Sequence, residues 1–140
     1  GYVLAPANIT ALIRKVYQFM AFAANTPIQH AYAEILDRSE LFTGLGSFYQ
    51  DKRDFFREAV KTSKFKLFPC NGSYFQILGY EKLSELPDME MARYLTKEKG
   101  IASIPVSAFY KRKTDHKVLR FCFAKSEDTL SKAADILCSL

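Results

Sequence analysis

The chain has 140 residues, 49% of them apolar and 25% charged, which is enough for one domain with a sizeable core. The formal charge is +5, but the basic residues are spread through predicted helices and the dense run at 110–117 is interpreted as a solvated loop, so nucleic-acid binding is not indicated. No apolar run is long enough to span a membrane, and we expect no signal peptide at the start.

The first third of the chain is predicted to be helical after a short strand. Residues 2–5 (YVLA) form an apolar run typical of a buried strand. Apolar residues at helical spacing then predict a helix that follows Asn8, the expected N-cap, and frays near residue 23. A second helix is predicted from Thr26, as its N-cap, to about Arg38.

The pattern changes after a third predicted helix at 47–62. Two short strands are predicted at 65–68 and 73–78, separated by the turn signal PCNG. A helix follows, with Asp88 as the expected N-cap and Gly100 as its stop.

The last third of the chain alternates strand and helix. Residues 101–110 read as a strand that becomes irregular at Pro105, and 117–124 read as another strand. Ser126 is the expected N-cap of a final helix. Helices first, then strands mixed with helices on a mostly antiparallel sheet, predict an α+β fold.

Arg120 is the one charged residue in the strand VLRFCFA. Alternation places Arg120 on one face together with Val118 and Cys122, and Leu119 and Phe121 on the other. Burying an arginine is costly unless an anionic group meets it. The pattern leaves open whether that group is a structural carboxylate or a ligand, or whether the side chain reaches water.

No self-contained catalytic or metal centre is visible. The three cysteines, Cys70, Cys122 and Cys138, are widely spaced and form no Cys/His ligand pattern, so neither a metal site nor a disulfide framework is expected. Free thiols are typical of a reducing compartment, and we expect a cytoplasmic protein.

Four segments occur in an order that points to a family. They are NTPIQHAYAE, PCNGSYF, GIASIPVSAFY and VLRFCFAKSEDTL. Together they resemble the C-terminal part of the class I/II, pyridoxal-phosphate-dependent aminotransferases, in the branch of the kynurenine and methionine enzymes. The opening GYVLAP resembles the strand after that family's lysine-bearing loop.

The resemblance implies a C-terminal fragment. Residues 1–22 would be the end of a large-domain strand and a connecting helix, and residues 23–140 the small domain. The family's Schiff-base lysine and its groups for the cofactor phosphate and pyridine nitrogen lie upstream. We therefore expect no catalytic or cofactor-binding residue here, and no activity from these residues alone.

The resemblance also implies roles for three residues. Arg120 matches the arginine that binds the substrate α-carboxylate, a task suited to a planar, permanently charged guanidinium. Phe22 would line the substrate pocket of the neighbouring subunit in a homodimer, although its spacing alone favours a buried helix-end residue. Asn25 could share that role or simply end the helix. Pro105 and Ser107 resemble a loop near the substrate entrance or are ordinary turn residues.

The leading hypothesis is an aminotransferase acting on amino acids and 2-oxo acids. The loop QFMAFAANTP has no basic residue, so methionine, aromatic, kynurenine-like or glutamine donors are expected over aspartate. One alternative is a cysteine-conjugate β-lyase with the same cofactor, since the carboxylate clamp serves both reactions. An alternative of another class is a non-catalytic α+β interaction module.

Overall fold

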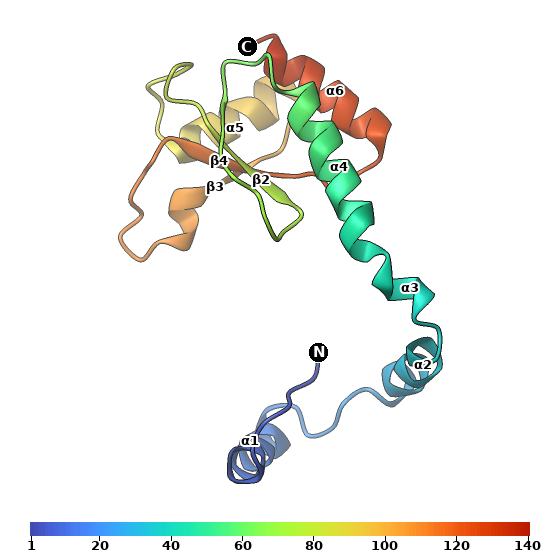
Figure 1. Ribbon diagram of the computed structural model, residues 1–140. Helices are drawn as coiled ribbons and strands as arrows, with labels where there is room; N and C mark the ends of the chain where they lie inside the picture. Colours follow the sequence, from blue (N-terminus) through green and yellow to red (C-terminus); the bar gives the residue numbers. More distant parts are fainter. The chain divides into compact units, whose positions relative to one another are not determined.

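The computed structural model describes residues 1–140 and divides into two compact units, Gly1–Gly44 and Leu45–Leu140 (Figure 1). None of its helices is both long and apolar enough to cross a lipid bilayer. The predicted boundary after residue 22 rests on the family resemblance and stays a prediction.

The unit Gly1–Gly44 is helical, as expected. It contains α1 (Ala7–Met20), α2 (Thr26–Leu36) and the short α3 (Glu40–Thr43). Neither α1 nor α2 has a buried residue, and the apolar positions that predicted α1 by their spacing are 39–85% exposed: Ile9, Leu12, Ile13, Val16, Phe19 and Met20. Helical spacing identified the helix but not a core, because burial also requires a partner surface.

Three details of the sequence-based prediction are wrong in this unit. Residues 2–5 form no strand, because a strand is held by hydrogen bonds to a neighbouring strand and the sheet includes none of these residues. Asn8 lies inside α1 and does not cap it. Asn25, rather than Thr26, caps α2, since its side-chain oxygen accepts a hydrogen bond from the backbone N–H of Ile28 at 3.2 Å.

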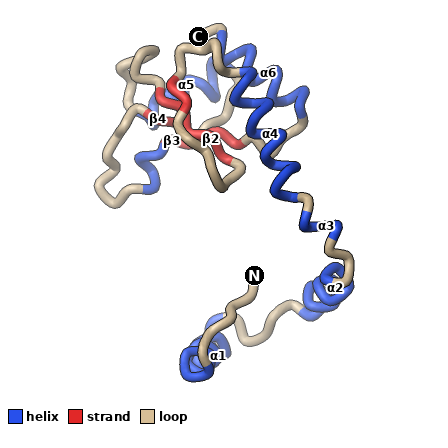
Figure 2. The backbone as a smooth tube through the Cα atoms, viewed as in Figure 1, coloured by secondary structure: helices blue, strands red, loops and turns tan.

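The unit Leu45–Leu140 confirms the α+β prediction. Its elements in chain order are α4 (Leu45–Ala59), β1 (Lys66–Leu67), β2 (Phe75–Gly79), α5 (Asp88–Lys99), β3 (Ile104–Pro105), the 3-10 helix η1 (Val106–Phe109), β4 (Val118–Cys122) and α6 (Glu127–Cys138). The strands, red in Figure 2, form an antiparallel sheet with the order β1-β2-β4-β3. Strands β2 and β4 pair from Phe75 opposite Cys122 to Gly79 opposite Val118.

One face of this sheet packs on the helices. Leu119 and Phe121 of β4 are buried together with Phe123, with which alternation predicted that they share a face. The same core includes Val60, which follows α4, and side chains from α4, α5 and α6: Phe56, Met91, Ala92, Leu95, Leu130, Ala134 and Leu137. Because successive residues of a strand point to opposite faces, Arg120 and Cys122 lie on the face away from this core.

The helix ends of this unit follow the sequence signals with one exception. The Ser126 hydroxyl accepts a hydrogen bond from the Thr129 N–H at 3.4 Å and caps α6, as predicted. Asp88 is the exception: it begins α5, but its carboxylate bonds to Ser107 instead of capping the helix. The competing partner comes from a segment 19 residues away, which local sequence patterns do not reveal.

Gly100 ends α5 in the left-handed conformation, with φ at 71°. A Cβ at this position would meet no atom within 4 Å, so replacement by alanine changes only the backbone preference. We expect Gly100→Ala to destabilise the protein by about 1 kcal/mol, because residues other than glycine are disfavoured at this φ.

The measurement is the urea midpoint of the full-length protein. Gly72→Ala is the control, since Gly72 has equally open surroundings and no positive φ. Equal midpoints for the two variants would contradict the expectation.

Candidate functional site

Arg120 occupies the centre of the sheet, on the face that the helices leave open. Its Cα partners are Ile77 on β2 and Ile104 on β3, so it lies between two neighbouring strands. A position between paired strands is rigid, because the backbone is hydrogen-bonded on both sides. The strand pairing therefore fixes the position of the Arg120 Cα, from which the side chain extends.

The guanidinium of Arg120 contacts two aromatic rings and no carboxylate. Its Cζ lies 3.9 Å from the ring centroid of Phe75 and 4.6 Å from that of Phe109. The ion pairs of the structure do not include Arg120, and its Nε is buried without a hydrogen-bond partner. Arg120 therefore does not form the structural salt bridge that the sequence had left open.

The ring of Phe109 is supplied by η1, which is anchored to α5. The buried carboxylate of Asp88 accepts hydrogen bonds from the Ser107 backbone N–H at 2.8 Å and from the Ser107 hydroxyl at 2.7 Å. Both residues are at most 4% exposed. Two short, buried hydrogen bonds to one carboxyl group therefore hold the backbone two residues before Phe109. Ser107 is therefore more than an ordinary turn residue.

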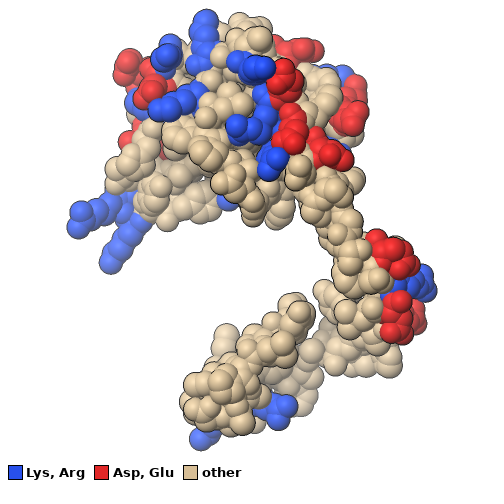
Figure 3. All heavy atoms as spheres, in the orientation of Figure 1, with Lys and Arg blue, Asp and Glu red and all other residues tan.

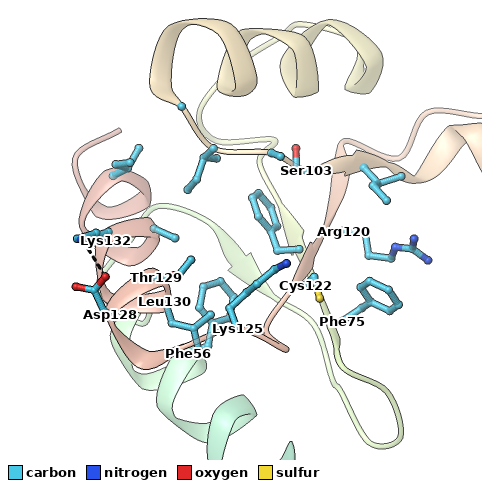
Figure 4. A pocket seen from close by; sticks show the side chains of 17 residues that line it. Phe56, Phe75, Ser103, Arg120, Cys122, Lys125, Asp128, Thr129, Leu130 and Lys132 are labelled. Atoms are coloured by element: carbon cyan, nitrogen blue, oxygen red, sulfur yellow. Dashed lines mark hydrogen bonds and ion pairs between the residues drawn. The ribbon is translucent and has the colours of Figure 1, made fainter.

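A cavity of about 520 Å³ lies beside β4, between the segment Gly100–Ile104 and α6. Figure 4 shows Phe56 and Leu130 on the α6 side of this cavity and the charged group of Arg120 directed away from it, beside Phe75. Lys132 on its rim pairs with Asp128 at 2.7 Å. Arg120 and Phe75 are themselves among the residues that line the cavity, so the cavity extends to the sheet position that Arg120 occupies.

Phe22 and Asn25 belong to the other unit, Gly1–Gly44. Phe22 has a left-handed φ of 65° and a side chain that is 88% exposed, so it is not the buried helix-end residue that its spacing favoured. A phenylalanine at such a φ is uncommon and strained. Asn25 caps α2 and so has a structural role, whatever else it does.

Ionisable groups elsewhere in the second unit are perturbed by burial and pairing. Burial raises the pKa of the Tyr80 phenol well above its usual range, with smaller contributions from Asp115 and Asp88. The Tyr80 hydroxyl donates a hydrogen bond to the Leu86 carbonyl at 2.9 Å. Because the pKa of Tyr80 is raised, its phenol stays protonated at neutral pH and acts as a hydrogen-bond donor.

The surface of this unit mixes both signs of charge on the face that Figure 3 displays. The basic loop residues Lys111, Arg112 and Lys113 are exposed, in agreement with the interpretation of a solvated loop.

The sequence did not reveal Phe75 and Phe109 as neighbours of Arg120. Phe75 could have been found, because pairing of the two predicted strands brings it to the same face as Arg120. Phe109 lies in the irregular segment after Pro105, where no periodicity predicts which way a side chain points.

Comparison with known families gives a match along almost the whole chain. The family model for aminotransferases of class I and II matches residues 1–137. The chain is 44% identical over 138 residues to a methionine aminotransferase of Escherichia coli, covering 98% of this chain and 36% of that protein. It is 32% identical over 163 residues to a kynurenine–oxoglutarate transaminase of Dictyostelium discoideum, covering 100% of this chain and 37% of that protein.

Solved structures agree. An E. coli protein with methionine aminotransferase function superposes with a TM-score of 0.92 at 43% identity, over 98% of this chain and 36% of that one. N-succinyldiaminopimelate aminotransferase of Mycobacterium tuberculosis superposes with a TM-score of 0.87 at 28% identity, over 96% and 36%. The chain thus spans about a third of the length of the relatives it matches, and it belongs to the class I and II aminotransferase family.

Proposed function

We propose that the protein transfers amino groups between amino acids and 2-oxo acids with pyridoxal phosphate, and that Arg120 binds the substrate α-carboxylate. The observation that carries this proposal is a partly buried guanidinium with two aromatic contacts and no carboxylate partner. A guanidinium in that setting has its hydrogen-bonding edge free for an anion, and a planar carboxylate matches two of its N–H donors.

Carboxylate binding by Arg120 would orient the rest of the substrate. With the carboxylate held by two parallel hydrogen bonds, the amino group and the Cα–H bond have defined directions. Such positioning is a large part of what a protein contributes to cofactor chemistry.

The residues around Arg120 do not fit the cofactor by themselves. A Schiff base requires a lysine amine, and the groups in contact with the guanidinium are aromatic rings. We propose that another part of the enzyme holds pyridoxal phosphate, as the family resemblance implies. The three free thiols favour a cytoplasmic location.

The loop around Phe22 supports a second element of the proposal, a homodimer in which this loop reaches the partner's substrate pocket. Phe22 is exposed and held at a strained φ, and strained residues cluster at functional sites. Asn25 stiffens the same loop by capping α2. Met20 is 81% exposed, and together with Phe22 it offers apolar, polarizable surface to a substrate side chain.

The test of this function is a panel of amino donors with the full-length enzyme at a fixed 2-oxo acid. We expect higher kcat/KM for methionine, phenylalanine, kynurenine and glutamine than for aspartate, because a buried second carboxylate would have no basic partner in the loop. The product 2-oxo acid of each donor is measured.

Aspartate matching or exceeding methionine and phenylalanine would contradict the expectation. Pyruvate released from a cysteine conjugate without any acceptor would instead identify the β-lyase alternative.

A further inference from the structure

We propose that Phe109 is a positioning residue for the substrate clamp: its ring holds the Arg120 guanidinium so that the N–H edge faces the carboxylate. This inference rests on the proposed function, because it concerns how the same arginine is made ready for its ligand. Phe75 supplies a second ring from the neighbouring strand.

The first step of the argument is the geometry of the contact. The Cζ of the guanidinium lies over both rings, 3.9 Å from the centroid of Phe75 and 4.6 Å from that of Phe109. A contact between a cation and a ring face uses no N–H donor, and the ion pairs of the structure do not include Arg120, whose Nε has no hydrogen-bond partner. A carboxylate neighbour would also have held the arginine, but it would have occupied the donors that the substrate needs.

The second step is the way in which Phe109 itself is held. Phe109 is 58% exposed, so packing alone does not fix it. Its short helix is fixed instead by the Asp88 carboxylate, which binds the backbone and the hydroxyl of Ser107. The anchor is buried while the ring is at the surface, an arrangement that places an apolar side chain beside a charged one at a defined point.

The third step is energetic. A free arginine side chain has many rotamers, and ordering it on binding costs affinity unless it is ordered beforehand. The rings also keep water from one side of the guanidinium, and lower local polarity strengthens an ion pair. Loss of the Phe109 ring should therefore weaken binding of the carboxylate in particular, with little change for ligands that lack one.

The experiment uses the full-length enzyme and two probes, methionine without its amino group and the primary amide of that acid. Inhibition constants are measured for wild type, Phe109→Ala, Phe109→Leu, Phe109→Tyr and Arg120→Met, and for Phe109→Ala combined with Arg120→Met. The matched control is Phe48→Ala, since Phe48 is 51% exposed and contacts a different cation, Lys52, at 4.9 Å. Thermal midpoints of all variants are recorded.

We expect Phe109→Ala to raise the inhibition constant of the acid by about 3- to 30-fold, the factor that a partly desolvated cation–π contact represents. The amide should change little. Phe109→Tyr should restore binding, because it keeps the ring face, whereas Phe109→Leu should not. In the combined variant, loss of the ring should add nothing to the loss of the arginine.

Other outcomes would contradict the inference, and they distinguish failure of the proposed carboxylate clamp from failure of the positioning role of Phe109. If Arg120→Met leaves binding of the acid unchanged, the proposed clamp itself is wrong, and the role of Phe109 falls with it. If Arg120→Met weakens the acid but Phe109→Ala does not, the clamp stands and the positioning role is wrong. Equal weakening of acid and amide, additive losses in the combined variant, or rescue by leucine would each show that Phe109 acts independently of Arg120.

Discussion

Arg120→Met in the full-length enzyme is expected to lower kcat/KM for amino acid donors by about 2–5 kcal/mol in transition-state free energy. Methionine keeps an unbranched apolar side chain, although it is shorter than arginine, and it removes the charge and the two hydrogen bonds proposed for the carboxylate. Steady-state kinetics with methionine as donor would measure the loss.

Two further variants distinguish a role of Arg120 in substrate binding from a structural role. Arg120→Lys should recover little, because an ammonium lacks the planar fork that matches a carboxylate. Arg112→Met is the control, since Arg112 is exposed in the loop after η1. A near-normal kcat/KM for Arg120→Met, with a lowered thermal midpoint, would instead assign a structural role to the arginine.

Asp88→Ala should destabilise the protein by about 2–4 kcal/mol, because it leaves two donors of Ser107 without an acceptor in a buried place. Asp88→Asn should cost less, since one amide oxygen can still accept one of the two hydrogen bonds. The measurement is the shift of the urea midpoint of the full-length enzyme relative to wild type.

Asp128→Ala provides the matched control for the aspartate. Its carboxylate also forms a short contact, 2.7 Å to Lys132, but both side chains are more than 70% exposed. Exposed ion pairs contribute little to stability, so this variant should unfold close to wild type. If Asp88→Ala behaves like the control, the buried bonds to Ser107 do not stabilise the fold.

Much of the fold was predictable because its signals are local. Local patterns identified the longer helices, Ser126 and Gly100 marked helix ends correctly, and alternation placed Leu119 and Phe121 on one face, which is buried in the structure. Helix capping and the alternation of side chains along a strand both depend on residues that are close together in the sequence, so local patterns are enough to predict them.

The tertiary structure decided what Arg120 meets. The sequence showed a charged residue in an apolar strand and left open whether it meets a carboxylate, water or a ligand. In the fold, Arg120 contacts the rings of Phe75 and Phe109. Strand pairing places Phe75 beside Arg120, whereas Phe109 comes from the irregular segment after Pro105.

The hydrogen-bond partner of Asp88 was likewise not predictable from the local sequence. Its position before a helix predicted a cap, yet its carboxylate found stronger partners on Ser107, which is 19 residues away. Residues 2–5 likewise read as a strand, but no strand of the sheet pairs with them. By itself the sequence determined the helices, the strand faces and the family resemblance, because these follow from local patterns and motifs. Partners of polar groups were decided only by the fold, because hydrogen bonds and ring contacts form between segments that are distant along the chain.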